Sequence, residues 1–205
     1  MDRVKSKGKS MKSLLLVPVV IIAISLVNTA NAATNGTVNF SGKLNDQTCQ
    51  VVLNNGSSAS GTVQLPTVSK ELLTSGGGRT AGKTPFTLTL TGCKASSTSF
   101  GVTAYFPATA YTDSGGFLKN LETGTTAAER VVLEILQKNG TTETPLRIGK
   151  PITDASYKYT IVAAGATSVT MYYAVRYKNG WASGSQYDTT PGKVKGIAIY
   201  ELAYQ

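Results

Sequence analysis

The sequence contains no histidine, and this absence removes the commonest kinds of active site. Ser–His and Cys–His nucleophile pairs need an imidazole as general base, and histidine is also the most frequent metal ligand. A Ser–Lys dyad or a carboxylate pair stays possible, but the spacing of the acidic residues singles out none. The stretch "GGGRTAGKT" at 76–84 lacks the G-x-x-x-x-G-K-[ST] spacing of a phosphate-binding loop. We therefore predict a protein that is not an enzyme and that needs no metal or cofactor.

Cysteine is scarce, because Cys49 and Cys93 are the only two in the chain. In an oxidising compartment a single pair of cysteines is most simply a disulfide. A metal site and a reactive thiol are the alternatives, although a metal site would lack further ligands of the usual kinds. We expect the disulfide.

Long apolar runs are absent except near the start of the chain. Five basic residues precede the apolar stretch Ser13–Val27, and the small residues Ala30–Ala32 follow it. This order is typical of a secretory signal peptide. A retained membrane anchor is the alternative, but the stretch is shorter than the roughly 20 residues of a membrane span and contains Pro18. We expect residues 1–32 to be a signal peptide and the product to be secreted.

Clusters of basic residues are absent from the rest of the chain. The leader contains five of the 20 basic residues and one of the 11 acidic ones, which leaves 15 against 10 and a net charge of +5. These basic residues are scattered singly, without the interleaved aromatic residues of a nucleic-acid groove. We expect no nucleic-acid partner.

Short alternating runs between turn residues are abundant, and they predict β-strands. Three of them are "TPFTLTLTGC" at 84–93, "SFGVTAYF" at 99–106 and "SVTMYYAVRY" at 168–177. A fourth strand is expected over Val131–Gln137, because β-branched residues are frequent there and the hairpin turn Asn139-Gly140 follows. A short helix before it is possible, and 54–61 and 75–83 are expected to be surface loops. Many short strands with glycine-rich turns favour an all-β sandwich.

Both ends of the mature chain are predicted to be strands. In "NGTVNFSG" at 35–42, Gly36, Val38 and Phe40 share one face. The last stretch, "KVKGIAIYELAYQ", alternates up to the terminal residue. Chain ends usually fray, so an apolar strand that ends the chain is expected to be paired and buried.

The order and spacing of these motifs resemble the pilin subunits of chaperone-usher fimbriae, most closely the type 1 family, over the whole mature chain. The resemblance rests on the leader, "GTVNFSGKL", "DQTCQV", "FTLTLTGC", "YYAVRY", "TPGKVKG" and a terminal strand whose penultimate residue is Tyr204. Gly192 lies fourteenth from the end, where that family keeps a glycine.

The resemblance implies an incomplete immunoglobulin-like β-sandwich that lacks its last strand, which another subunit or a chaperone donates. It implies a signal peptide at 1–32, an N-terminal donor-strand extension at 33–42 and a pilin domain at 43–205. The donor residues are then Thr34, Gly36, Val38 and Phe40. The groove edge and chaperone-contact strand are then Gly192, Ala198, Tyr200, Leu202, Tyr204 and Gln205.

The resemblance also implies the partners of the chain. They are identical or related pilin subunits, a periplasmic chaperone that anchors the carboxylate of Gln205, an outer-membrane usher, and a host surface receptor for the assembled fimbria. The chain is expected to pass through the periplasm to a fimbrium at the cell surface, as a structural subunit that polymerises by donor-strand exchange. The alternative is a minor adaptor, or a single-domain adhesive subunit that binds a host ligand through a loop such as Gly180–Tyr187.

One feature departs from the family pattern. Cys49 is only the seventeenth residue counted from Ala33, so the extension is a few residues short of the usual length. The far end of the groove is then filled by Thr34 or left empty.

Overall fold

The computed structural model describes residues 39, 41, 42, 44, 46, 47, 49–74, 78–180 and 188–205. The chain divides into two compact units, Met1–Gly42 and Lys43–Gln205. The expected signal peptide and the donor residues Thr34, Gly36, Val38 and Phe40 lie outside the described residues. Within the described ranges, no helix is long and apolar enough to span a membrane.

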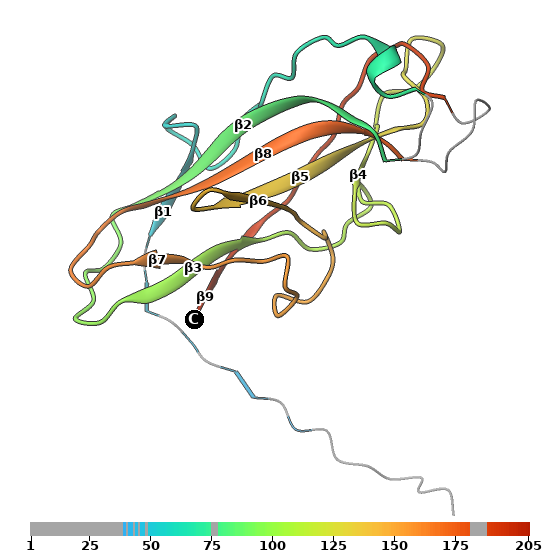
Figure 1. Cartoon of the computed structure of the whole chain (residues 1–205). Helices are drawn as coiled ribbons and strands as arrows, with labels where there is room; N and C mark the ends of the chain where they lie inside the picture. Colours follow the sequence, from blue (N-terminus) through green and yellow to red (C-terminus); the bar gives the residue numbers. More distant parts are fainter. Residues whose placement is uncertain are drawn as a thin grey trace, which may run out of the picture. The chain divides into compact units, whose positions relative to one another are not determined.

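The described part of the second unit contains nine β-strands and one short 3-10 helix (Figure 1). The elements are β1 (Gln50–Leu53), η1 (Lys70–Leu72), β2 (Thr80–Thr91), β3 (Phe100–Tyr105), β4 (Leu118–Lys119), β5 (Val131–Asn139), β6 (Thr142–Pro145), β7 (Thr160–Val162), β8 (Val169–Asn179) and β9 (Glu201–Tyr204).

The strands form two antiparallel sheets. The larger has the order β1-β2-β8-β5-β4, and β6 pairs with β5 farther along the edge that β4 also uses. The smaller has the order β7-β3-β9. A single cluster of buried side chains draws on both sheets, so the sheets are the two layers of a β-sandwich. The all-β sandwich predicted from the alternating runs is confirmed.

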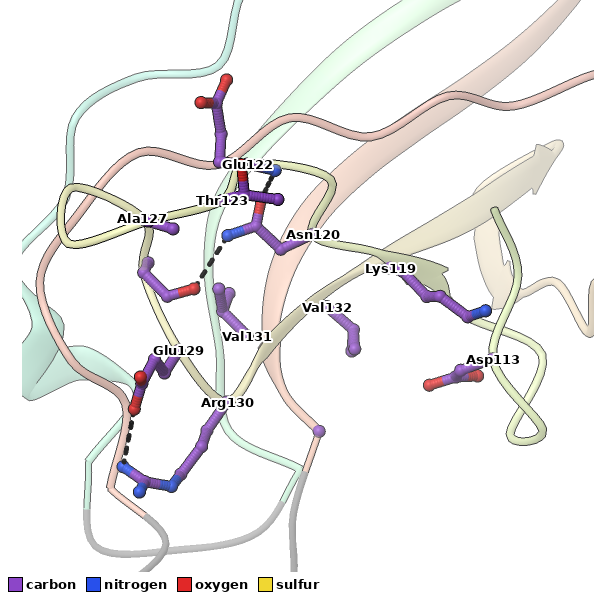
Figure 2. Close-up of a pocket in the computed structure, with 13 residues that line it drawn as sticks. Asp113, Lys119, Asn120, Glu122, Thr123, Ala127, Glu129, Arg130, Val131 and Val132 are labelled. Carbon is purple, nitrogen blue, oxygen red and sulfur yellow. Dashed lines mark hydrogen bonds and ion pairs between the residues drawn. The ribbon is translucent and has the colours of Figure 1, made fainter. Parts of the chain in front are cut away.

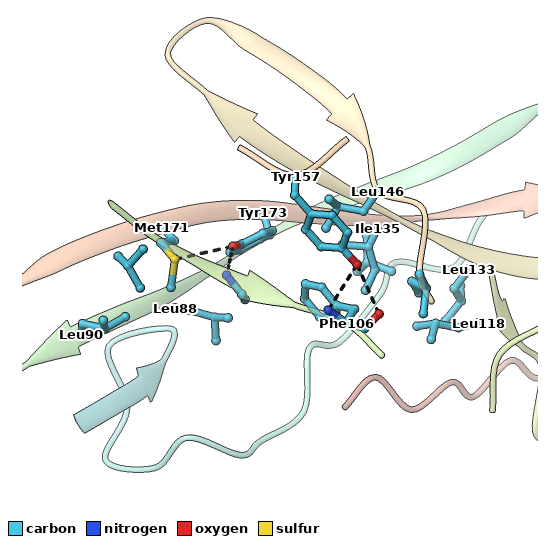
Figure 3. Close-up of a cluster of buried hydrophobic side chains, with 14 of the residues drawn as sticks. Leu88, Leu90, Phe106, Leu118, Leu133, Ile135, Leu146, Tyr157, Met171 and Tyr173 are labelled. Atoms are coloured by element: carbon cyan, nitrogen blue, oxygen red, sulfur yellow. Dashed lines mark hydrogen bonds between the residues drawn. The ribbon is translucent and has the colours of Figure 1, made fainter. Parts of the chain in front are cut away.

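The alternating faces of the predicted strands supply the core (Figure 3). Leu88 and Leu90 of β2 lie on the same face of the larger sheet as Met171 and Tyr173 of the neighbouring β8, and all four are almost completely buried. The strand predicted over Val131–Gln137 is β5, which continues to Asn139. Its inward residues are also buried, because a period of two places every second side chain on the core face.

One turn lies where the sequence predicts it, and in two other places the chain differs from the expectation. Asn139 pairs with Thr142, so Gly140 with its φ of +61° lies in a two-residue hairpin loop. Gly92, with a φ of +60°, ends β2 before Cys93. The stretch before β5 is a turn without a helix. The loop expected at 75–83 is wrong in its second half, because Thr80–Lys83 already belongs to β2 and pairs with β8 across an irregularity between Ala81 and Thr84.

Cys49 and Cys93 form a disulfide, as expected. It joins the residue before β1 to the turn after β2, where Gln50 and Thr91 begin the ladder between these strands. A cross-link between residues 44 positions apart restricts the unfolded chain and so stabilises the fold.

Candidate functional site

Among the described residues, the C-terminal strand β9 has a partner on only one side. It pairs with β3 and forms an edge of the smaller sheet. Gln205 and Gly101 exchange both backbone hydrogen bonds, at 3.0 and 3.2 Å. By antiparallel alternation, Ala203 and Glu201 point to β3 in the same way, and the backbone groups of the residues between them, Tyr204, Leu202 and Tyr200, point to the other side. That side of β9 is an unpaired sheet edge among the described residues.

β9 is shorter than the alternation predicts, because it begins only at Glu201. The next hydrogen-bonded pair in its ladder with β3 would place Pro107 opposite Ile199. Proline has no N–H to donate, so the ladder stops. The expectation that the whole terminal run is paired and buried is therefore corrected: Ala198 is exposed, and Tyr200, Leu202 and Tyr204 are half-buried.

A cavity of about 530 Å³ lies beside this unpaired edge. Residues between 59 and 65 form one side, which we call the first rim. Residues 195–200 form the other side, which we call the second rim. Side chains of the sandwich core form its floor, among them Leu88, Phe106, Leu133, Ile135 and Val175. We call this cavity the groove. It is an opening in the sandwich through which core side chains are reached.

The second rim has backbone groups available for pairing. Lys195 accepts a hydrogen bond from Leu121 and donates one to the side chain of Asn120. Between Gly196 and Tyr200, no backbone N–H or C=O has a hydrogen-bond partner among the described residues. An apolar floor bordered by unpaired backbone is the arrangement that an added β-strand satisfies.

Tyr200 lies at one end of the groove and connects its two rims. Its hydroxyl donates a hydrogen bond of 2.9 Å to the carbonyl oxygen of Ala59, on the first rim. Its ring packs against Phe106 with the ring centroids 6.2 Å apart. Burial raises the pKa of the Tyr200 hydroxyl, which favours the protonated form that donates this bond.

The predicted site residues fall in four places. Ala198 and Tyr200 line the groove, whereas Leu202 and Tyr204 pack beside it against the core. Gln205 is exposed at the end of the chain. Gly192 does not line the groove: a Cβ added there would lie 2.4 Å from the backbone nitrogen of Ala128, so this glycine allows two backbone segments to pack closely.

Sequence reasoning missed the first rim. Its start falls within the stretch expected to be a surface loop, and no alternation of long apolar residues marks it. Val63 and Leu65 are the only hint, because they are apolar residues two positions apart that the structure places against the core. Gly196 of the second rim was also missed, and a Cβ added there would come within 2.7 Å of the Cδ1 atom of Leu133.

A second cavity, of about 670 Å³, lies near the start of β5 (Figure 2). Its polar side chains mainly hold its own walls together. Asn120 donates to the carbonyl oxygen of Ala128 at 2.8 Å, and Arg130 pairs with Glu129. Asp113 accepts the backbone N–H groups of Gly115 and Phe117. Among the described residues, no group of three or more His, Cys, Asp or Glu side chains could hold a metal ion.

Comparison with known proteins supports an assignment based on this geometry. Residues 38–205 match the family model described as fimbrial protein. The F17 fimbrial protein of Escherichia coli is 35% identical over 181 residues, which cover 87% of this chain and 92% of that one. The major fimbrial subunit SMF-1 of Stenotrophomonas maltophilia (strain K279a) is 32% identical over 176 residues, which cover 85% of this chain and 95% of that one.

A solved structure of a chaperone-usher pilus shares the fold. It aligns with a TM-score of 0.50 and 16% sequence identity, and the alignment covers 84% of this chain and 97% of the other. The fold class is therefore an immunoglobulin-like sandwich that lacks a strand, as the resemblance implied. The chain belongs to the fimbrial protein family, and its assignment as a chaperone-usher pilin with a structural role in a fimbrium is confirmed. The alternative of an adhesive subunit is not favoured, and residues 181–187 of the loop suggested for it lie outside the described residues.

Proposed function

We propose that this subunit polymerises by donor-strand exchange, in which residues 33–42 of one copy occupy the groove of the next. The observation that carries the proposal is the groove itself, where core side chains and the unpaired backbone of 196–200 lie open beside β9. The extension offers the matching features, because Val38 and Phe40 share one face of a strand and the polar residues between them lie on the other. Complete burial of each would contribute roughly 1.5 to 3 kcal/mol.

The exposed groove also explains the need for a chaperone. An unpaired apolar edge is a template for aggregation, so it must be covered before a neighbouring subunit arrives. A periplasmic chaperone would lend a strand to the groove and bind the carboxylate of Gln205, which is exposed and so accessible. Residues 1–32 would direct export, and an outer-membrane usher would then replace the chaperone strand with the extension of the next subunit.

The experiment uses the full chain bound to its periplasmic chaperone. A synthetic peptide of residues 33–42 is added, and chaperone release is followed by size-exclusion chromatography. We expect the peptide to displace the chaperone and deletion of 33–42 to abolish polymer at the cell surface. The proposal is wrong if the peptide never displaces the chaperone and the deletion leaves polymer formation intact.

A further inference from the structure

The second rim of the groove is anchored at both of its ends. At one end the chain enters β9, which pairs with β3. At the other end, Lys195 accepts a hydrogen bond of 2.7 Å from the backbone of Leu121 and donates one of 3.0 Å to the Oδ1 atom of Asn120. The backbone of 196–200 has no partner of its own among the described residues. Its position is therefore set by the β9 ladder on one side and by the contacts of Lys195 on the other.

Asn120 uses the full hydrogen-bonding capacity of its side chain. Its Oδ1 atom accepts from the backbone N–H groups of Lys195 and of Glu122, the latter at 3.1 Å. Its Nδ2 atom donates to the carbonyl oxygens of Ala128 at 2.8 Å and of Lys193 at 3.0 Å. Figure 2 shows the bonds to Glu122 and Ala128. An amide has two N–H donors and an oxygen with two lone pairs, so this one side chain joins three segments of the chain.

The strand before Asn120 belongs to the floor of the groove. Leu118 of β4 pairs with Leu133 of β5, and both side chains line the groove. Asn120 follows Leu118 by two residues and binds Lys195, with which the second rim begins. The bond between Asn120 and Lys195 therefore fixes the rim relative to the floor at this end.

The segments next to the rim are also joined by a backbone bond that does not involve the Asn120 side chain. Ala128 donates to the carbonyl oxygen of Lys193 at 3.0 Å. Without the Asn120 side chain, Lys193 would keep this bond. The backbone of Lys195, in contrast, would keep the bond from Leu121 alone among the described residues. Loss of Asn120 should therefore release the start of the rim more than it loosens the segment before it.

We propose that Asn120 is a positioning residue for donor-strand exchange, because it holds Lys195 and so keeps the free backbone of 196–200 in place to pair with an added strand. This inference rests on the proposed exchange. Ordering a chain segment opposes binding, so a rim that is fixed in advance binds the donor more tightly. Without the bond to Lys195, the donor itself must order the rim. The donor should then dissociate about ten- to a hundredfold faster.

The test compares two amide side chains that make several hydrogen bonds in different places. Gln137 makes three, to Thr103 and Lys158, and does not line the groove. Each full-length chain is purified with its periplasmic chaperone, and a fluorescent peptide of residues 33–42 replaces the chaperone. Dissociation of the peptide is followed by fluorescence polarisation against an excess of unlabelled peptide. Asn120→Ala should speed dissociation about ten- to a hundredfold, whereas Gln137→Ala should change it by less than about twofold.

A third variant separates the bond to Lys195 from the two donated bonds. Asn120→Asp keeps an oxygen that accepts from Lys195 but can no longer donate to Ala128 and Lys193. It should lower the free energy of unfolding in urea, as Asn120→Ala does, and yet release the peptide within about threefold of the natural rate. Should Asn120→Ala fail to fold, Asn120→Ser takes its place, because its oxygen lies one bond nearer to the backbone and farther from Lys195.

The possible outcomes separate the two proposals. The role of Asn120 is overturned if the truncated variant releases the peptide at the natural rate, if Gln137→Ala speeds release equally, or if Asn120→Asp releases it as fast as the truncation does. A peptide that never replaces the chaperone on the natural chain contradicts donor-strand exchange itself. Normal exchange with an unchanged dissociation rate in Asn120→Ala contradicts only the role of Asn120.

Discussion

The side chain of Gln137, on β5, donates a hydrogen bond of 3.1 Å to the hydroxyl of Thr103, on β3. The bond joins the two sheets inside the core, where both residues are almost completely buried. Gln137 also donates to the carbonyl oxygen of Lys158 and accepts from its N–H. A hydrogen bond between side chains therefore connects the two sheets at Gln137, whereas the sandwich is open at the groove beside β9.

Loss of the Gln137 side chain should destabilise the subunit strongly. Gln137→Ala removes three hydrogen bonds of a buried side chain, one to the Thr103 hydroxyl and two to the backbone of Lys158, and a polar group left unpaired where water cannot reach it costs about 1 to 3 kcal/mol. We expect the free energy of unfolding in urea to fall by about 2 to 4 kcal/mol. Gln50→Ala, at an exposed strand position, should change it by less than about 0.5 kcal/mol. Equal effects of the two substitutions would contradict this role.

Gly192 should not tolerate any side chain. A Cβ at this position would lie 2.4 Å from the nitrogen of Ala128 and 2.5 Å from the carbonyl carbon of Ala127, and neither backbone atom can move away cheaply. We expect Gly192→Ala to lower the thermal midpoint by an amount equivalent to about 2 kcal/mol or more. Gly124→Ala is the comparison, because nothing lies within 4 Å of a Cβ there and only the φ of +80° is unfavourable. Similar losses for the two variants would show that packing is not the cause.

The carboxylate of Glu134 should contribute far more to the free energy of unfolding than an exposed carboxylate does. It is almost fully buried and accepts from Arg176 at 2.7 Å and from Lys178 at 2.8 Å. Glu134→Gln removes the negative charge between two half-buried cations. We expect it to lower the free energy of unfolding in urea by about 3 kcal/mol. Lys83→Ala, which breaks an exposed ion pair with Glu143, should cost less than about 1 kcal/mol and lose its effect in high salt. A loss for Glu134→Gln as small as that of the exposed pair would refute this expectation.

Alkaline pH should weaken the fold through Tyr157. Burial raises the pKa of its hydroxyl to about 12, while the hydroxyl donates to the carbonyl oxygen of Phe106 at 3.2 Å. Because the folded pKa lies above the unfolded value of about 10, the folded state holds this proton more tightly. The contribution is complete below pH 10 and disappears as pH rises toward 12.

The measurement is urea unfolding at steps between pH 8 and pH 12. Tyr157→Phe should be less stable than the natural chain at pH 8, because two hydrogen bonds to Phe106 are lost, and should lose less stability as pH rises. Tyr111→Phe serves as the control for general alkaline effects. If Tyr157→Phe followed the same pH profile as the natural chain, the hydroxyl would not be the responsible group.

The long central strands could be predicted because burial on one face imposes a period of two on the sequence. β2, β3, β5 and β8 are all found where residues such as Leu88, Val102, Ile135 and Met171 alternate with polar ones. The cysteine pairing followed from chemistry alone. Three of the short strands could not be predicted in this way, because their two to four residues carry too little of the pattern. These strands, β4, β6 and β7, are extended because they pair with longer neighbours, and their own residues do not predict a strand.

The sequence by itself determined the class of protein, the cysteine pair and the apolar alternation at both ends of the chain, because these depend on residue types and spacing. The tertiary structure alone decided where the open edge lies, since Pro107 ends the ladder opposite Ile199 and leaves the backbone of 196–200 without a partner among the described residues. It also decided that Ala59 and Tyr200, far apart in the chain, meet across the groove. Such contacts depend on how distant segments pack, and no local pattern encodes them.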